Sequence, residues 1–85
     1  MRGRKPRIVA IAPGDVAALR WVASGSAVPS YQARRAKVVL AIANGLRTQH
    51  VAEEMEYDAA TVWRICRRYE HGGLSGLLAD ERRRA

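Results

Sequence analysis

Cysteine, acidic residues and long apolar runs are the scarce features of this chain. Cys66 is the single cysteine, which excludes a disulfide framework and indicates a reducing, intracellular setting, with the thiol as core filler. No apolar run approaches the ~18 residues that span a bilayer, and the Met1 end lacks the apolar segment of a signal peptide. The sequence therefore predicts a soluble, cytoplasmic protein without a membrane partner.

Patterns for metal binding and nucleophilic catalysis are also missing. The two histidines and the cysteine lack the paired spacing of a zinc site, and no serine has an identifiable base beside it. The 85 residues support one small core and are too few for a catalytic core with an extended substrate cleft. We expect no enzyme activity, no catalytic residues, no metal and no cofactor.

Positive charge is the feature that the sequence has in excess. Fifteen Lys and Arg residues stand against eight Asp and Glu residues, which gives a formal charge of +7. A surplus of this size is typical of proteins that bind nucleic acid or another anionic surface.

Turn residues and apolar spacing predict four helices and an all-α fold of four to five helices. A first helix begins at Asp15, which acts as N-cap after the Pro13-Gly14 turn, and stops at Gly25. The second has Ser30 as its cap and Asn44-Gly45 as its end, and its apolar second half predicts neighbours on several sides. The stretch "RIVAI" before the first helix is consistent with an extended segment.

Two further helices follow at close spacing. Thr48 caps the helix "TQHVAEEM", and Asp58 caps a helix that ends at Gly72-Gly73. Beyond it, the predicted core receives Leu74, Leu77 and Leu78. We divide the chain into a basic arm (1–12), a helix-turn-helix domain (13–79) and a basic exit segment (80–85).

The two close helices have the pattern of a DNA-binding helix-turn-helix. In the second of them, a stripe at helical spacing is predicted to be buried: Val62, Ile65, Cys66 and Tyr69. The wedge between the two helices is expected from Val51, Met55, Val62 and Ile65, with small Ala52 at the close crossing. The outward face then holds Ala60, Arg64, Arg67 and His71, flanked by Trp63 and Arg68.

We predict two sets of DNA contacts from this arrangement. The major-groove set is Asp58, Ala59, Ala60, Trp63, Arg64 and Arg67, since small residues allow close approach and guanidinium groups suit guanine edges. The phosphate set is Arg34, Arg35, Lys37, Thr48, Gln49 and Arg68.

Simpler explanations exist for several of these residues. Asp58 and Thr48 are needed as caps, Arg67 and Arg68 suit the helix dipole, and Trp63 is equally consistent with a partly buried flank. Four acidic residues lie near the turn: Glu53, Glu54, Glu56 and Asp58. They would repel DNA unless they pointed to solvent or to Arg34, Arg35 or Arg47.

Four short motifs between Arg34 and Arg84 resemble one known family. They are Arg34-Arg35-Ala36-Lys37, Gly45-Leu46, Thr61-Val62 and the closing Gly73-Leu74-Ser75-Gly76-Leu77. This run resembles the N-terminal DNA-binding domain of mariner-type bacterial insertion-sequence transposases. The resemblance implies a homeodomain-like fold, double-stranded DNA of a transposon end as the partner, and a bacterial cytoplasmic, nucleoid-associated location.

The chain departs from that family in two ways. The turn reads Met55-Glu56-Tyr57-Asp58 where the family usually has Leu-Gly-Val-Ser, so the left-handed position falls to Glu56. Family members also continue into a metal-dependent catalytic domain, whereas this sequence stops at Ala85. We therefore expect a chain that binds DNA and does not cut it.

The basic start of the chain, "RGRKPR", resembles arms that enter a narrow A·T-rich minor groove. The predicted groove contacts are Arg2, Gly3, Arg4, Lys5 and Arg7. A basic tail that gives only salt-dependent affinity is the alternative. Two other functions stay open at this stage: a free-standing transcriptional regulator, for which a homodimer and a palindromic site are expected, and a protein-interaction module using Trp21, Trp63 and Leu78.

Overall fold

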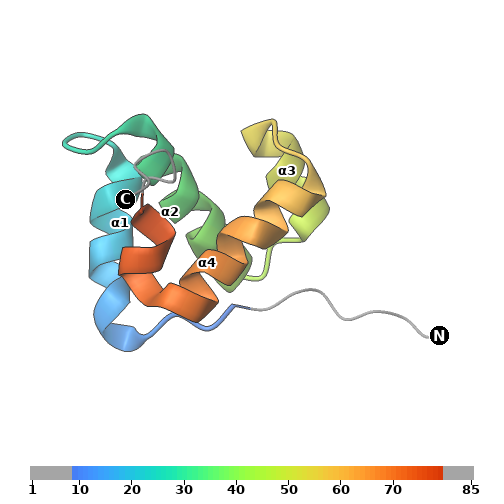
Figure 1. Cartoon of the computed structure of the whole chain (residues 1–85). Helices are drawn as coiled ribbons and strands as arrows, with labels where there is room; N and C mark the ends of the chain where they lie inside the picture. Colours follow the sequence, from blue (N-terminus) through green and yellow to red (C-terminus); the bar gives the residue numbers. More distant parts are fainter. Residues whose placement is uncertain (1–8, 80–85) are drawn as a thin grey trace.

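Four α-helices follow one turn of 3-10 helix in the computed structural model, which describes residues 9–79. The 3-10 turn η1 spans Pro13–Asp15, α1 spans Val16–Ser24, α2 spans Ser30–Ala43, α3 spans Thr48–Met55 and α4 spans Ala59–Leu78. Figure 1 shows α1 and α3 on opposite sides of the molecule, with α2 and α4 between them. Residues 9–79 contain no strand, so the predicted all-α fold is confirmed.

Helix α2 is the centre of the hydrophobic core. It contacts α1, α3 and α4, and its Ala36, Val38 and Val39 are completely buried. Leu40 and Ala41 are half-buried and pack against the same core. This confirms the prediction that the apolar second half of α2 has neighbours on several sides.

The predicted stripe of α4 is buried as a whole. Val62 and Cys66 have no exposed surface, and Ile65 and Tyr69 are each only 6% exposed. Three residues of α3 pack against this stripe. Val51 and Ala52 are buried, and Met55 is half-buried. Cys66 is thus part of the core, as the sequence predicts.

Asp15 occupies the N-cap position of α1, as predicted, but its side chain does not cap the helix. Its side chain makes no capping hydrogen bond, and its backbone lies in the right-handed helical region, within η1. One carboxylate oxygen instead accepts a hydrogen bond of 2.7 Å from the hydroxyl of Tyr69 on α4. A distant partner has replaced the local one, because the buried phenol brings a strong donor to the carboxylate.

Ser30 and Thr48 are not caps either, since each is the first residue of its helix. The residues before them, Pro29 and Arg47, have extended ψ values of 148° and 146°. Their carbonyl groups already accept the first helical hydrogen bonds, the one at Arg47 from Val51 N–H at 3.0 Å. Both helices therefore begin without a side-chain cap.

The predicted helix ends at Gly25 and Asn44-Gly45 are confirmed. Gly25 has φ of 75° and its N–H donates to the carbonyl of Val22. After α2, the N–H groups of Gly45 and Leu46 donate to the carbonyls of Ile42 and Ala41, which is the pairing of a Schellman motif. The φ of 96° at Gly45 explains why glycine stands there.

The turn between α3 and α4 has its left-handed residue at Glu56, as predicted. Glu56 has φ of 61° and ψ of 38°, and no other non-glycine residue among 9–79 has a positive φ. The N–H of Tyr57 donates to the carbonyl of Ala52 at 2.9 Å and closes the turn. The chain thus makes this turn without glycine, at a local conformational cost.

Helix α4 breaks at Gly73, where its end was predicted, and a second helical segment follows. Gly73 has φ of 63° and ψ of −156°, and the helix then continues to Leu78. This second part packs Leu77 into the core with no exposed surface and half-buries Leu74 and Leu78. A Cβ on Gly76 would lie 3.1 Å from the carbonyl oxygen of Arg68, so the second part lies close against the first.

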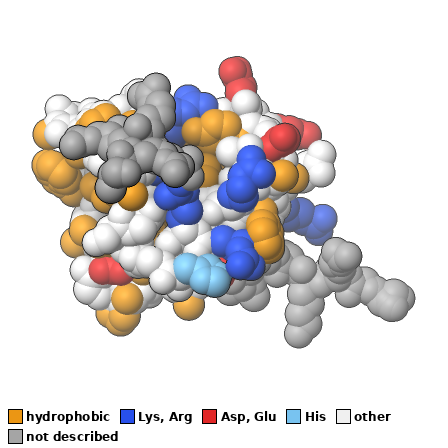
Figure 2. Space-filling model, in the orientation of Figure 1, with side chains coloured by type: hydrophobic (Ala, Val, Ile, Leu, Met, Phe, Trp, Pro, Cys, Tyr) orange, Lys and Arg blue, Asp and Glu red, His pale blue; other side chains and the backbone are white. Residues whose placement is uncertain are grey.

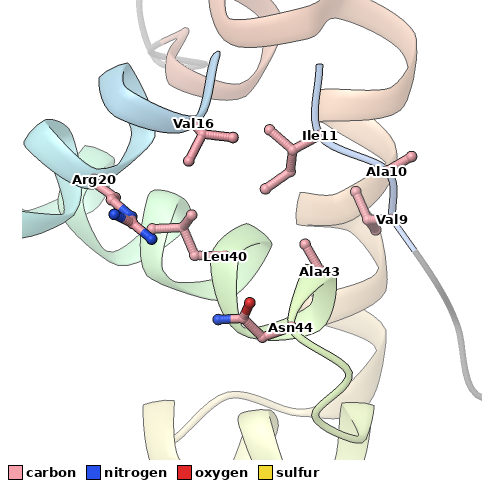
Figure 3. A pocket seen from close by; sticks show the side chains of 8 residues that line it. All are labelled: Val9, Ala10, Ile11, Val16, Arg20, Leu40, Ala43 and Asn44. Carbon is pink, nitrogen blue, oxygen red and sulfur yellow. The ribbon is translucent and has the colours of Figure 1, made fainter. Parts of the chain in front are cut away.

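Residues 9–12 have no regular secondary structure and cover part of the core. Val9 is 2% exposed, and Ile11 is half-buried against the core. Together with α1 and α2 they form a groove, shown in Figure 3, whose polar groups come from Arg20 and Asn44. The packed part of the chain therefore begins before Pro13, while the division into arm, domain and exit segment stays a prediction. Among residues 9–79, no helix is long and apolar enough to cross a membrane.

Candidate nucleic-acid interface

The part of α4 before its break at Gly73 presents one exposed face, which we call the reading face: Ala60, Trp63, Arg64, Arg67 and His71. Four of these lie opposite the buried stripe, and Trp63 lies at their flank, as the sequence predicts from helical spacing. Trp63, Arg64, Arg67 and His71 also line a shallow depression together with Arg68. Figure 2 shows Lys and Arg side chains gathered over α4 beside a histidine, while acidic side chains gather at the α3 end.

The side chains of the reading face are partly ordered by one another. The guanidinium carbon of Arg67 lies 4.6 Å from the centre of the Trp63 ring, in cation–π geometry. Trp63 is 42% exposed, so a DNA contact by its ring stays a prediction beside its role as a partly buried flank. Arg64 donates a long hydrogen bond of 3.4 Å to the hydroxyl of Thr61. A weakly bonded guanidinium and a stacked one therefore lie on the same face.

Asp58 caps α4, as predicted. Its Oδ1 accepts a hydrogen bond of 2.8 Å from Thr61 N–H. Hydrogen bonding from the side chain of Thr61, and then from its backbone N–H, lowers the pKa of the Asp58 carboxyl, with a smaller contribution from the charge of Arg64. The cap accounts for the residue, and a base contact by Asp58 stays a prediction, as it does for its exposed neighbour Ala59.

Three arginines of the predicted phosphate set hold the fold together. Arg34 donates to the carbonyl of Met55 at 2.6 Å and to the hydroxyl of Tyr57 at 2.9 Å. Through Nη1, Arg35 donates to the carbonyls of Leu77 and Ala79, at 2.9 and 2.6 Å. Arg68 donates to the carbonyl of Gly76 at 3.1 Å. These bonds give each of the three arginines a structural role within the fold, and their phosphate contacts stay a prediction.

The other predicted phosphate residues lie on α2 and at the start of α3. Lys37 and Gln49 are exposed, and Thr48 is half-buried as the first residue of α3. The acidic residues near the turn do not pair with Arg34, which is held by Met55 and Tyr57. Glu53 and Glu54 are exposed, and Glu54 lies 3.7 Å from His50.

A pocket between α2 and α4 was not predicted. Its lining combines aromatic, hydroxyl and guanidinium groups: Tyr31, Arg35, Tyr57, Thr61, Arg64, Ile65 and Arg68. Arg35 stacks over the ring of Tyr31 and Arg34 over the ring of Tyr57, each at 4.9 Å. Sequence spacing could not reveal this site, because Arg34 and Tyr57 are 23 residues apart and meet only through the fold.

The predicted minor-groove contacts Arg2, Gly3, Arg4, Lys5 and Arg7 lie outside the described residues, as does the exit segment 80–85. Within residues 9–79, no three His, Cys, Asp or Glu side chains come together as a metal site would require. The described surface around Arg64 and Arg67 therefore presents cations, hydroxyl groups and the exposed indole of Trp63.

Comparison with known proteins agrees with this architecture. A family model described as a homeodomain-like domain matches residues 30–78, from the start of α2 to the end of α4. No curated protein and no solved structure matches the chain significantly. The matched region covers more than half of the sequence and contains the complete helix-turn-helix, a motif typical of DNA-binding domains. The chain belongs to the homeodomain-like domain family.

Proposed function

We propose that this domain binds double-stranded DNA sequence-specifically, with the reading face of α4 in the major groove. The observation that carries the proposal is the composition of that face, where Arg64 and Arg67 flank small Ala60 and an exposed Trp63. An α-helix fits the major groove of B-DNA, and an arginine that contacts guanine O6 and N7 discriminates between base pairs. Lys37, Gln49 and Thr48 would contact phosphates from α2 and α3.

We further propose the end of a transposon as the target, for a transposase whose catalytic domain is not in this sequence. The support is the set of four motifs that resemble mariner-type transposases, together with the family match over the same region. Such an end is read in one direction, so an asymmetric site is expected, whereas a dimeric regulator of the same fold reads a palindrome.

Selection from a random duplex library tests both levels of the proposal. At about 150 mM salt, where non-specific phosphate attraction is weak, the protein should enrich an asymmetric motif. A palindrome would contradict the transposon-end target and favour a regulator. The absence of any enriched motif would contradict sequence-specific binding itself.

Arg64→Ala then tests the assignment of the reading face. We expect a loss of about 1–3 kcal/mol in binding free energy and relaxed preference at one base position. Arg20→Ala is the matched control, because Arg20 is an exposed arginine on α1 that lines the groove of Figure 3. An unchanged base profile for Arg64→Ala would remove this residue from the interface.

A further inference from the structure

The pocket between α2 and α4 is continuous with the reading face. Arg64 and Arg68 line both the pocket and the shallow depression on α4. The pocket has a volume of about 260 Å³. A group projecting from a ligand on the reading face could therefore enter it without crossing another element.

The lining of the pocket is suited to an anion. Three of its residues, Arg35, Arg64 and Arg68, carry guanidinium groups, and none of its lining residues among 9–79 is acidic. Thr61 and Tyr57 add hydroxyl groups. Burial lowers the pKa of Arg68, and the positive charge of Arg35 lowers it further, so the cations here are crowded and partly desolvated. A bound anion would offset both effects.

The donors are already held in place before any ligand arrives. The bond from Arg68 to Gly76 and the bonds from Arg35 Nη1 to Leu77 and Ala79 fix two guanidinium groups against the end of α4. Stacking on the Tyr31 ring orients the Arg35 plane. Ordered guanidinium forks match the oxygens of a phosphate in bidentate geometry and lose little side-chain entropy on binding.

We propose that this phosphate pocket receives one phosphodiester group of the DNA backbone, at the edge of the groove occupied by α4. The inference rests on the proposed DNA binding and names a contact within it. A carboxylate of a partner protein would meet the same charges, but the shared residues Arg64 and Arg68 tie the pocket to the face that enters the groove. One backbone strand at the edge of the major groove is the anion nearest to that position.

Neutral phosphates allow a direct test on the full chain. Once the wild-type protein has selected its site, each phosphate of that duplex is replaced in turn by an uncharged methylphosphonate. Binding of wild type, Arg68→Gln, Arg68→Lys and the control Arg20→Gln is then measured on every duplex. Gln and Lys both keep a donor for the Gly76 carbonyl, and thermal melting of each variant confirms that it is folded.

On the unmodified duplex, Arg68→Gln should weaken binding about tenfold and reduce the slope of log K against log salt by about 1. Arg68→Lys, which keeps the charge but loses the fork, should weaken binding about threefold. On the one duplex that lacks the pocket's phosphate, both variants should bind within twofold of wild type. Arg20→Gln should stay within twofold of wild type throughout.

Two results would overturn the inference in different ways. In the first, wild type binds DNA tightly, but the loss of affinity caused by each Arg68 variant is the same on every methylphosphonate duplex as on the unmodified one. The pocket then does not hold a backbone phosphate, although DNA binding stands. If wild type selects and binds no duplex, the proposed function fails and the phosphate pocket fails with it.

Discussion

Tyr69→Phe should destabilise the domain by cutting the link between α4 and the segment before α1. The Tyr69 hydroxyl accepts a hydrogen bond of 3.0 Å from Ala12 N–H and donates one of 2.7 Å to Asp15 Oδ2. The ring is 6% exposed and stays filled by phenylalanine, so the change leaves no cavity. The variant therefore isolates the two hydrogen bonds.

The expected loss follows from the environment of the two partners. A hydrogen bond to a charged group contributes about 1.5–3 kcal/mol and a neutral one about 0.5–1.5 kcal/mol. Ala12 is exposed and Asp15 half-buried, so both regain water when the hydroxyl is removed. We expect a net loss of about 1–3 kcal/mol in the free energy of unfolding, measured by urea denaturation with an unchanged m-value.

The pH dependence gives a second test of the same contact. Burial raises the pKa of the Tyr69 phenol above its ordinary value near 10, and the hydrogen bond to Asp15 raises it further. The unfolded chain thus loses this proton at lower pH than the folded chain. The extra stability of wild type over Tyr69→Phe should be full below pH 10 and decrease as pH rises through the folded pKa.

Tyr31→Phe is the matched control for this experiment. Its hydroxyl makes two long hydrogen bonds: it donates to the carbonyl of Leu78 at 3.4 Å and accepts from Nε2 of Gln32 at 3.5 Å. We expect its loss to be under about 0.5 kcal/mol, since such long contacts are weak. Equal stability of Tyr69→Phe and wild type at pH 7, or a difference between them that is unaffected by pH up to 11, would refute the role of Tyr69.

Three further variants test backbone geometry and capping. Gly73→Ala should lower the free energy of unfolding by at least about 1–3 kcal/mol, because a φ of 63° with a ψ of −156° is nearly restricted to glycine. Gly72→Ala is the control, since a Cβ at that position would meet open space. In the same urea titration it should be neutral or stabilising by under about 1 kcal/mol. Glu56→Gly should stabilise the turn by about 0.5–1 kcal/mol, as the φ of 61° then costs nothing; a lower melting temperature would contradict this. Asp58→Ala should lower the melting temperature at pH 7 and have little effect near pH 2. Because the pKa of the Asp58 carboxyl is lowered in the folded protein, the charged cap stabilises the domain above the ordinary carboxyl pKa, and this stabilisation is lost as pH falls through the folded pKa. Equal effects at both pH values would refute the charged cap.

Apolar spacing was the reliable part of the sequence. It predicted which face of α4 is buried, from Val62 to Tyr69, and that α2 is surrounded on several sides. These features depend only on helical periodicity and on the need to bury apolar surface, and both can be read locally. The reading face followed at once as the opposite side of the same helix.

Side-chain partners were predicted less well, because the fold supplies competitors that local sequence does not reveal. Asp15 was predicted to cap α1, but the hydroxyl of Tyr69, 54 residues away, is its partner. Glu53 and Glu54 were considered as partners for Arg34, yet Arg34 is held by a carbonyl and a phenol on the turn. Capping rules describe an isolated helix end, and a tertiary contact with a stronger or better-placed group overrides them.

The closing sequence Gly73-Leu74-Ser75-Gly76-Leu77 shows how one local break organises the candidate interface. The positive φ at Gly73 turns the end of α4, so that Leu77 enters the core and the small Gly76 lies against the Arg68 turn. The last carbonyls of α4 then face α2 and Arg68, which satisfy them with guanidinium groups. Because the same guanidinium groups line the phosphate pocket, the break in α4 also sets the position of that pocket beside the reading face. Part of the positive charge behind the net charge of +7 therefore belongs to arginines that bind carbonyl groups within the fold.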